Sequence, residues 1–399
     1  MNKSHVAALI RGLLINLTKK PHVVVWESPT KNISEKAMNI KISSPENAEN
    51  DVRKAYGEWK EKQAADKSAT EVLLPSCVYV TGAVEALFWT GNDLDSARKH
   101  LAEKDATPVW EKIASINKAA LDPDERALVL KNKLALVTGG AQGIGEEIVI
   151  NLAASGALVF IADINLEGAR ELAKKINAGR TSAIALEVDV SNEASVEALF
   201  NTIAELAGGL DLCVSNAGVL KAGSVLEQDL ADFKFVTDVN YSGFFTVTKY
   251  AGRLLRVQHL TAPDWKTDII QINSKSGLEG SNKNAAYSGG KFGGLGLVSS
   301  FAKELIEYNI KVNAICPGNF LDGPLWSDPD TGLFVQYLKA GKVPGAKNLA
   351  DVRAFYEAKV PMKRGCTGKD VMRALRYIVE QEYETGQAVP VTGGQVMLH

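Results

Sequence analysis

The sequence LALVTGGAQGIG occupies residues Leu134–Gly145. Its first four residues predict a buried strand, and the glycines after it permit a tight turn into a helix. Gly139, Gly143 and Gly145 would let a pyrophosphate approach the backbone, because the next helix offers N–H groups and a positive dipole end to an anion. The alternative is a plain glycine-rich turn without a ligand. The position of the motif, after a strand and before a helix, favours a dinucleotide site.

Apolar strands and helices alternate along the chain from this motif onward. The expected strands are Leu134–Val137, Ala157–Ala162, Ser182–Val188, Leu210–Ser215, Ile269–Ile272, Lys311–Ile315 and Gln387–Val391. Helices are expected between them, for example at Glu167–Ile176 and Glu193–Ala207. This alternation predicts an α/β fold with a doubly wound parallel sheet of the Rossmann type, and we place this domain at residues 131–399.

Residues 1–130 differ in character and are predicted to form a smaller α/β appendage. The apolar spacing of Val6–Leu17 predicts an amphipathic helix docked on a core, and Arg11 argues against a signal sequence. The other expected elements are strands at His22–Trp26 and Val72–Val80, helices at Glu46–Ala64, Asp93–Leu101 and Val109–Ala119, and a joint at Asp122–Arg126. Four of the six tryptophans lie here, which argues against a disordered tail. We expect a docked structural or assembly element, with a partner-binding module as the alternative.

Composition narrows the range of partners. The net charge of −2 gives no reason to expect nucleic acid or an acidic membrane surface, and no segment is apolar enough to span a bilayer. The cysteines are Cys77, Cys213, Cys316 and Cys366. They are widely spread, with neither a C-x-x-C pair nor a His/Cys cluster, so no metal site is expected. Free thiols of this kind suit a reducing cytoplasm.

A candidate catalytic pair lies in the sequence YSGGK at Tyr287–Lys291. Residues four apart share a helix face, so both side chains can enter one site. A lysine ammonium favours the phenolate and is expected to lower the pKa of Tyr287, which would make the phenol an acid and base for a hydroxyl or carbonyl. Ser274 follows the strand Ile269–Ile272, where loops carry chemistry in open α/β sheets. For the pair alone, a solvated helix face is the alternative.

Asp163 ends the second strand of the domain. A carboxylate at this position can accept both ribose hydroxyls of an adenosine and repel a 2′-phosphate. No basic residue stands at Gln142, Ile164 or Asn165 to attract such a phosphate, which favours NAD over NADP. The alternative is a carboxylate that caps the next helix.

Further polar or small residues follow the other strands. Asp189 can contact the adenine amino group or cap its loop, and the small residues of Asn216–Gly218 leave room for a cofactor or form a simple turn. Asn240 interrupts a helical pattern, which favours a buried polar role. Pro317-Gly318 begins a long excursion, residues 319–360, which we interpret as a lid over the substrate.

Together these motifs resemble the short-chain dehydrogenase/reductase family over residues 131–399. The resemblance implies an oxidoreductase in which Tyr287 is the general acid/base, while Lys291 lowers its pKa and holds the nicotinamide ribose. It also implies that Ser274 hydrogen-bonds the substrate oxygen and that Asn240 supports the lysine through a water. The cofactor contacts implied are Gly139, Gln142, Gly143, Ile144, Gly145, Asp163, Asp189, Val190, Asn216, Ala217, Gly218, Tyr287, Lys291, Pro317 and Gly318.

Longer stretches resemble the bacterial sorbitol-6-phosphate 2-dehydrogenases within that family. They are Ile269–Gly277, Lys291–Gly294, Lys359–Cys366 and Val391–Met397. This resemblance implies NAD-dependent interconversion of D-sorbitol 6-phosphate and D-fructose 6-phosphate by a homodimer or homotetramer. The candidates to bind the substrate phosphate are Lys275, Lys363 and Arg364, with solvated surface charges as the alternative.

The chain departs from the family pattern in two places. Asp322 stands where the wider family often has a threonine that touches the carboxamide, and residues 1–130 have no counterpart in the usual enzyme. One alternative function is a dehydrogenase of another sugar alcohol or sugar phosphate, and another is a dinucleotide-sensing protein without catalysis. The presence of Ser274, Tyr287 and Lys291 favours an enzyme, because a sensor would not need all three.

Overall fold

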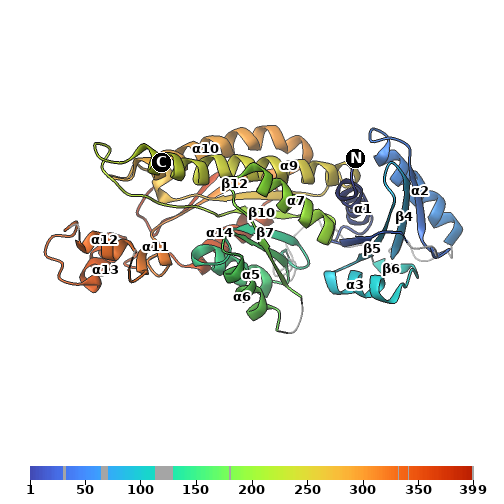
Figure 1. Ribbon diagram of the computed structural model, residues 1–399, viewed down its shortest axis with the longest axis horizontal. Coiled ribbons are helices and arrows are strands. Elements are labelled where there is room, and N and C mark those ends of the chain that lie inside the picture. Colours follow the sequence, from blue (N-terminus) through green and yellow to red (C-terminus); the bar gives the residue numbers. More distant parts are fainter. Residues whose placement is uncertain are drawn as a thin grey trace.

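The computed structural model describes residues 1–29, 33–63, 71–112, 129–178, 181–330, 332–339 and 341–397. Within these ranges the strands form a seven-stranded, a four-stranded and a two-stranded sheet. Figure 1 shows the large sheet and its helices in the middle, with the N-terminal region at one end and a small group of helices at the other. The chain is therefore an α/β protein with a separate N-terminal mixed sheet, as the sequence predicts.

The large sheet is parallel throughout and has the strand order β13-β12-β11-β10-β7-β8-β9. Its strands are β7 (Leu134–Thr138), β8 (Leu158–Asp163), β9 (Ala183–Glu187), β10 (Leu212–Ser215), β11 (Thr267–Ile272), β12 (Ile310–Pro317) and β13 (Ala388–Val391). The strand order reverses between β7 and β10, which is the arrangement of a doubly wound fold. All seven strands expected from the sequence are confirmed.

Helices cover both faces of this sheet (Figure 1). One layer consists of α5 (Gly143–Ala154), α6 (Leu166–Ile176) and α14 (Gly368–Glu380), and the other of α7 (Glu193–Ala207), α9 (Gly243–Thr261) and α10 (Ala285–Leu305). Leu134 and Leu136 of β7 pack in the layer of α7, α9 and α10, whereas Ala135 and Val137 pack in the layer of α5, α6 and α14. The strand is apolar without alternation because both of its faces are buried.

The N-terminal region forms a mixed sheet in the order β1-β5-β4-β2. Its strands are β1 (Val23–Glu27), β2 (Met38–Ile42), β4 (Cys77–Gly82) and β5 (Ala86–Gly91), and its helices are α2 (Ala48–Gln63) and α3 (Leu94–Glu103). β2 runs parallel to β4, while the other neighbouring strands are antiparallel. A further antiparallel pair joins β3 (Glu71–Leu74) to β6 (Val109–Lys112). The predicted α/β character of the appendage is thus confirmed.

Two expected elements of this region are wrong. The expected strand Val72–Val80 is divided into β3 and β4, because Pro75 lacks the N–H that a continuous ladder requires. The expected helix Val109–Ala119 begins instead as strand β6, because pairing with β3 outweighs the local helical pattern. The rest of that helix and the expected joint Asp122–Arg126 lie outside the described residues.

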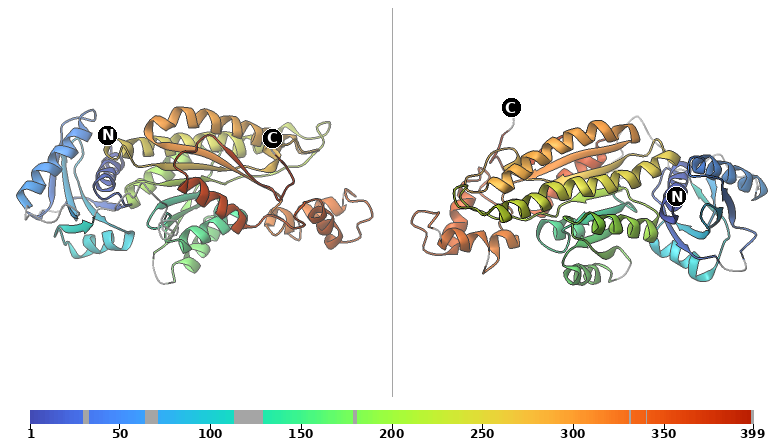
Figure 2. Two further views of the ribbon diagram at one scale, coloured as in Figure 1. Left: turned by 180° about the vertical axis from the view of Figure 1, so that it is seen from behind. Right: turned by 45° about the horizontal axis from the view of Figure 1, so that its top comes forward.

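Helix α1 (Lys3–Thr18) connects the appendage to the large domain. It lies between the appendage sheet and the end of α9 (Figure 2), and it is buried on nearly all sides rather than along one stripe. Gly12 permits the close approach, because a Cβ there would lie 2.2 Å from Thr261 Oγ1 and 2.4 Å from Gln258 O. Thr261 Oγ1 also donates to Leu9 O at 2.8 Å. The predicted helix and its docking are confirmed, but α1 is not buried along one face only, since it has neighbours on both sides.

Arg11 of this helix is fully buried in the contact. Its Nη2 lies 2.7 Å from Asp211 Oδ2, and its Nε donates to His22 O at 2.7 Å. Asp211 also accepts hydrogen bonds from Leu134 N at 2.8 Å and from Trp265 Nε1 at 3.0 Å. Burial acts to raise the pKa of Asp211, but Arg11 and the other partners hold it below its usual value. The appendage is thus fastened to the residue that precedes β10.

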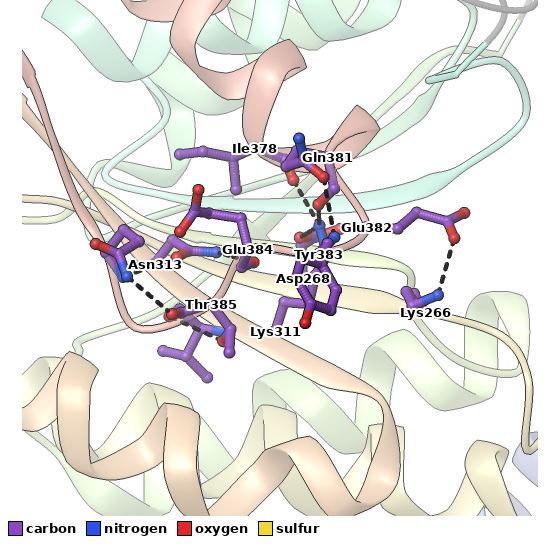
Figure 3. Close-up of polar contacts among 12 residues, drawn as sticks. Lys266, Asp268, Lys311, Asn313, Ile378, Gln381, Glu382, Tyr383, Glu384 and Thr385 are labelled. Atoms are coloured by element: carbon purple, nitrogen blue, oxygen red, sulfur yellow. Dashed lines mark hydrogen bonds and ion pairs between the residues drawn. The ribbon is translucent and has the colours of Figure 1, made fainter. Parts of the chain in front are cut away.

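A second buried ion pair lies at the same edge of the large sheet and is shown in Figure 3. Lys311 Nζ lies 3.0 Å from Asp268 Oδ1 and donates to Ile378 O and Gln381 O, at 2.5 and 2.8 Å. These contacts tie the starts of β11 and β12 to the end of α14. The amino ends of the strands are therefore occupied by structural contacts, and the opposite edge is left for chemistry.

The excursion after β12 is helical. It contains α11 (Pro324–Ser327), α12 (Leu333–Lys339) and α13 (Leu349–Ala358). These helices have a small core formed by Leu321, Trp326, Leu333, Phe334, Val343 and Val352. Leu220, from the loop after β10, packs against that core. The segment interpreted as a lid is therefore a folded unit that contacts a loop at the carboxyl edge of the sheet.

Candidate active site

The carboxyl ends of five strands carry most of the predicted site residues. Because the strands are parallel, these ends lie along one edge of the sheet. The glycine turn follows β7, Asp163 ends β8 and Asn216 follows β10. Ser274 follows β11, and Pro317 ends β12. The fold thus gathers at one edge residues that are far apart in the sequence.

The glycine turn has the backbone expected of an anion-binding loop. Gly139 and Gly143 each have a φ of +62°, which residues with a side chain rarely adopt. A Cβ on Gly145 would lie 2.0 Å from Gly139 O, so this glycine lets α5 approach the turn closely. Gln142 is the N-cap residue of α5, but its side chain makes no capping bond. The first-turn N–H groups, including that of Ile144, are therefore not taken up by the cap side chain.

Asn216 and Ala217 couple β10 to this turn. Asn216 Nδ2 donates to Thr138 O at 3.0 Å and to Gly139 O at 2.8 Å. The backbone N atoms of Asn216 and Ala217 donate to Thr138 Oγ1 at 3.1 and 3.2 Å. A Cβ on Gly139 would lie 2.8 Å from Ala217 Cα. These residues therefore form more than a simple turn, because they hold the anion-binding loop in position.

Asp163 lies directly beside the glycine turn and is 8% exposed. Its Oδ2 accepts a hydrogen bond from Ala141 N at 3.0 Å, and its Oδ1 accepts one from Asn165 N at 2.9 Å. Asn165 caps α6, because its Oδ1 accepts from Gly168 N at 3.0 Å. The helix-cap alternative is thus wrong for Asp163, which instead joins the end of β8 to the glycine turn.

Asp189 makes the loop-capping contacts that the sequence allowed as an alternative. Its Oδ1 accepts hydrogen bonds from Ser191 N at 2.9 Å and from Ser191 Oγ at 2.6 Å. Val190 is buried and packs against Gly243 at the start of α9. Both residues stabilise the loop after β9, and a contact of either with a cofactor stays a prediction.

Asn240 lies in a π-helical turn, Asp238–Ser242, that precedes α9. Its Oδ1 accepts from Val219 N at 2.8 Å, and its Nδ2 donates to Val219 O at 2.9 Å. A Cβ on Gly218 would lie 3.1 Å from Asn240 Oδ1 and 3.8 Å from Lys291 Nζ, so these three residues meet. Single π turns are frequent at functional sites. Asn240 therefore has a buried polar role, as an anchor for the loop after β10.

Tyr287 and Lys291 meet on α10, where Lys291 Nζ lies 5.6 Å from the centroid of the Tyr287 ring. Lys291 is 5% exposed and donates from Nζ to Ile272 O at 2.8 Å. Burial lowers the pKa of Lys291 to about 8. Burial also raises the pKa of Tyr287, while a hydrogen bond with Ser274 acts to lower it. The expected lowering of the Tyr287 pKa by Lys291 is therefore not seen, because loss of hydration has the larger effect.

Ser274 is positioned by the short turn η2 (Lys275–Gly277) that follows β11. Its Oγ accepts a hydrogen bond from Ser276 N at 3.1 Å. Ser274 is also near enough to Tyr287 to act on the pKa of the phenol, so the serine and the tyrosine lie in one site. A substrate oxygen placed between the two hydroxyl groups would contact both.

Asn273 is a positioning residue that the motif pattern does not reveal. It is 4% exposed, and its Nδ2 donates to Gln271 Oε1 at 2.7 Å and to Lys291 O at 2.9 Å. Its Oδ1 accepts from Ser274 N at 2.8 Å. Asn273 therefore holds Ser274, which follows β11, and Lys291 of α10 in a fixed relation. An amide that ends the apolar run IIQI is the signal that could have found it.

The candidate phosphate ligands have different surroundings. Lys275 is half-buried in η2. Arg364 donates two hydrogen bonds to Asp370, from Nη1 to Oδ2 at 2.6 Å and from Nη2 to Oδ1 at 3.0 Å. Asp370 lies in the first turn of α14. The bond from Arg364 holds the pKa of Asp370 well below its usual range. Lys363 is exposed and donates to Ala358 O at 2.9 Å. Arg364 thus already has the bidentate partner that a phosphate would need to displace.

Arg364 also lines a pocket at the carboxyl end of β13. This pocket has a volume of about 340 Å³ and is bounded by Met362, Asp370, Val391 and Gly393, among others. Tyr287 and Ser274 are not among its lining residues. The lining of this pocket therefore differs from the site in which the serine and the tyrosine meet.

Asp322, which departs from the family pattern, has a partner in the lid. Its Oδ1 accepts from Arg353 Nη2 at 2.7 Å, and Arg353 Nε donates to Glu357 Oε1 at 2.8 Å. This ion pair connects the start of the excursion to α13. The carboxylate therefore has a structural role where a threonine is usual.

The described ranges contain no group of three or more His, Cys, Asp or Glu side chains arranged to hold a metal ion. Over the same ranges, no helix is both long and apolar enough to cross a bilayer. The four cysteines are free and buried. Burial raises the pKa of Cys213 and of Cys316 to about 12, so neither is a thiolate at neutral pH.

The class of protein follows from this fold and site. A model of the short-chain dehydrogenase family matches residues 133–327. Sorbitol-6-phosphate 2-dehydrogenase of Escherichia coli (strain K12) is 39% identical over 271 residues, which are 67% of this chain and 99% of that relative. The chain belongs to the short-chain dehydrogenase family. It is therefore an oxidoreductase of a family that uses NAD(P) and acts on small substrates.

Two solved structures show the same architecture. Sorbitol-6-phosphate 2-dehydrogenase from Erwinia amylovora has 39% identity and a TM-score of 0.61, covering 66% of this chain and 100% of that chain. An actinorhodin polyketide ketoreductase, solved with NADPH, has 28% identity and a TM-score of 0.59, covering 66% of this chain and 97% of that chain. The N-terminal region is not covered by the similarity to the sorbitol-6-phosphate 2-dehydrogenases.

Proposed function

We propose that the protein is an NAD-dependent polyol-phosphate 2-dehydrogenase that interconverts D-sorbitol 6-phosphate and D-fructose 6-phosphate. The observation that carries this proposal is the 39% identity to the Escherichia coli enzyme over 99% of its length. Ser274, Tyr287 and Lys291 in one site support catalysis over dinucleotide sensing. We assign residues 131–399 to catalysis and residues 1–130 to a supporting role.

The residues of the site suit proton transfer at a secondary alcohol. Ser274 is placed to hydrogen-bond the C2 oxygen of the substrate. Tyr287 is placed beside it and, as its phenolate, would take the hydroxyl proton and become the neutral phenol. Bound NAD would accept the hydride that leaves C2. In the reverse direction, Tyr287 returns the proton to the same oxygen. Lys291 has a pKa of about 8 and is mainly protonated at neutral pH, so its charge favours the phenolate during the reaction.

We propose NAD rather than NADP as the cofactor. The glycine turn and the start of α5 suit a pyrophosphate, and Asp163 lies next to that turn. The side chain that follows it, Ile164, is 70% exposed and uncharged, so it offers nothing to a 2′-phosphate. The ketoreductase solved with NADPH is a relative with the other cofactor. The preference for NAD over NADP therefore depends on individual residues around Asp163 and not on the fold.

We also propose a homodimer or homotetramer. Phe233 and Phe235 of α8 (Leu230–Thr237), Phe245 of α9 and Phe292 of α10 are between 44% and 48% exposed. Exposed aromatic rings on neighbouring helices form an apolar surface that a second copy can cover. Analytical ultracentrifugation of the full chain tests this, and a monomer at micromolar concentration would contradict it.

A substrate panel tests the proposed reaction. NADH formation is measured with D-sorbitol 6-phosphate, with D-sorbitol and with other sugar alcohols and their phosphates, and NADP is compared in parallel. The highest kcat/KM is expected for D-sorbitol 6-phosphate with NAD. A higher value for an unphosphorylated alcohol would overturn the proposed substrate. Binding of NADH without turnover of any compound would favour a dinucleotide sensor.

A further inference from the structure

Strand β13 is followed by a closed turn that lies beside the end of β12. The turn consists of residues 392–396, and we call it the C-terminal turn. Thr392 Oγ1 donates to Val396 O at 3.1 Å and accepts from Val396 N at 3.3 Å, so one hydroxyl group closes the turn. Thr392 is 6% exposed. The C-terminal turn is therefore a defined part of the fold.

Gly318, the first residue after β12, packs directly on the C-terminal turn. Its N donates to Val391 O at 2.9 Å. A Cβ on Gly318 would lie 2.6 Å from Gln395 Oε1 and 3.1 Å from Thr392 O. A side chain at position 318 would therefore displace the Gln395 side chain or the backbone of the turn, because no room is left between the two segments.

Gln395 also binds the next residue, Asn319, which begins the lid. Gln395 Oε1 accepts a hydrogen bond from Asn319 N at 3.2 Å, and Asn319 O accepts one from Cys366 N at 2.8 Å. At the other end of the lid, Gly393 O accepts from Met362 N at 3.2 Å. The C-terminal turn thus contacts the chain both where it enters the lid and where it returns.

The segment held by Gln395 is a neighbour of the loop that carries Ser274. Ile272 of β11 pairs with Ile315 of β12, and Asn273 N donates to Ile315 O at 2.7 Å. A dinucleotide lies across the point where the strand order of a doubly wound sheet reverses. With its adenosine half toward β8, its nicotinamide half would lie toward β11 and β12. Gly318 would then line the nicotinamide part of the site.

We propose that Gln395 is a positioning residue that holds Gly318 and Asn319 where the nicotinamide half of the cofactor binds. This inference rests on the proposed dinucleotide-dependent reaction and adds a residue to which no role is assigned above. Hydride transfer requires close and aligned reacting atoms, so a small shift of the backbone under the nicotinamide slows it strongly. The adenosine half lies on the other side of the glycine turn and does not depend on this contact.

Replacing Gln395 with methionine tests the inference, because it removes the acceptor and keeps the length of the side chain. In Gln395→Met, the affinity for NADH is expected to fall about three- to tenfold, as for the loss of one hydrogen bond. The affinity for ADP-ribose, which lacks the nicotinamide, is expected to stay unchanged. The kcat with D-sorbitol 6-phosphate is expected to fall by up to about a hundredfold, with little change in its KM.

Two further variants serve as controls. Gln395→Glu keeps an oxygen acceptor for Asn319 N, so it should retain the NADH affinity and most of the turnover. Gln387→Met makes the same change at an exposed glutamine just before β13 and should alter neither. Melting temperatures of all variants show whether the domain has stayed folded. A loss in Gln395→Glu as large as that in Gln395→Met would overturn the inference, because the effect would then not depend on the acceptor.

The binding measurements separate this inference from the proposed reaction, because they need no polyol substrate. Calorimetric titrations of the full chain compare NADH with ADP-ribose in each variant. A selective loss of NADH affinity in Gln395→Met would support the role of Gln395 even if D-sorbitol 6-phosphate proved not to be the substrate. Equal losses of affinity for NADH and ADP-ribose would overturn it, and so would an unchanged NADH affinity.

Discussion

At the scale of single residues, burial changes the acid–base behaviour of the site. Burial lowers the pKa of Lys291 to about 8 and raises the pKa of Tyr287, although the two side chains are neighbours. Ser274 acts against the second effect by hydrogen bonding. The pKa values of these two side chains are therefore set by loss of hydration as well as by charge.

Replacing the tyrosine tests its catalytic role. Tyr287→Phe removes the hydroxyl and is expected to lower kcat by about 10²–10⁴-fold or more, the range typical of acid–base groups. NADH binding, measured by fluorescence titration, is expected to persist, because the ring remains in place. Near-normal turnover of this variant would show that another group transfers the proton.

The pH dependence of stability tests the burial of Lys291. Its pKa is 10.5 for an ordinary lysine and about 8 in the folded chain, so between these values the unfolded chain binds more protons. The contribution of this group to stability therefore rises as the pH increases through that window. Urea unfolding of the wild type and of Lys291→Met isolates the effect, and the wild type should gain stability relative to the variant. A constant difference across the window would contradict a buried, titrating lysine.

Asp163 and its neighbour are expected to set the cofactor preference. Asp163→Ala with Ile164→Arg removes a repulsive charge and adds a guanidinium, so the NADP/NAD ratio of kcat/KM should rise at least about tenfold. Activity with both cofactors should also fall, because Asp163 accepts a hydrogen bond from Ala141 N in the glycine turn. Ile164→Arg alone is the matched control and should shift the ratio less. An unchanged ratio in the double variant would remove Asp163 from ribose recognition.

At the scale of elements, close packing decides where α1 and the strands of the appendage lie. α1 approaches α9 at Gly12, and a hydrogen bond from Thr261 to Leu9 O fixes the depth of the contact. In β2, buried and exposed residues alternate strictly. This alternation is a strand signal in the sequence, although β2 is not among the strands predicted above. The helix contact, by contrast, depends on a partner more than two hundred residues away.

A pair of glycine substitutions tests the packing of α1. Gly12→Ala is expected to destabilise the protein by about 1–3 kcal/mol, because the new Cβ would overlap Thr261 Oγ1 and Gln258 O. Gly57→Ala on α2 is the control, since no atom lies within 4 Å of its Cβ position. It is expected to stabilise by about 0.5–1 kcal/mol through helix propensity alone. Urea unfolding compares the two, and similar effects would show that α1 does not pack closely on α9.

At the scale of the whole molecule, the appendage and the lid lie at different ends of the large domain (Figure 1). The appendage is fastened at the amino edge of the sheet, where Arg11 pairs with Asp211. The lid lies at the opposite end of the molecule (Figure 1). The described residues of the appendage therefore lie away from Tyr287, and we propose that the appendage stabilises the fold or assembly and does not take part in the reaction.

A shortened chain that begins at Val129 tests this division. It should retain turnover but melt at a lower temperature and be less soluble, because it exposes the α9 surface and leaves Asp211 buried without Arg11. Breaking one buried ion pair costs about 3–5 kcal/mol. Arg11→Met in the full chain is the matched control and should show the same loss of stability on a smaller scale. A shortened chain that is folded and binds NADH but has no turnover would place part of the active site in the appendage.

The sequence by itself determined the parallel sheet, the glycine turn and the meeting of Tyr287 with Lys291 on one helix. Strands buried on both faces and a glycine turn before a helix are local signals, because each depends on about ten neighbouring residues and on backbone freedom. The spacing of Tyr287 and Lys291 is equally local, since one helical turn brings them together. These features therefore need no knowledge of distant contacts.

Only the tertiary structure decided the features that depend on distant partners. The start of the region predicted as a helix is strand β6 because β3 offers a partner, and Arg11 is buried because Asp211 lies opposite it. Arg364 is occupied by Asp370, which holds it through two hydrogen bonds. Strand pairing and the hydration of a charge are set by residues far apart in the sequence. A local pattern therefore cannot predict them.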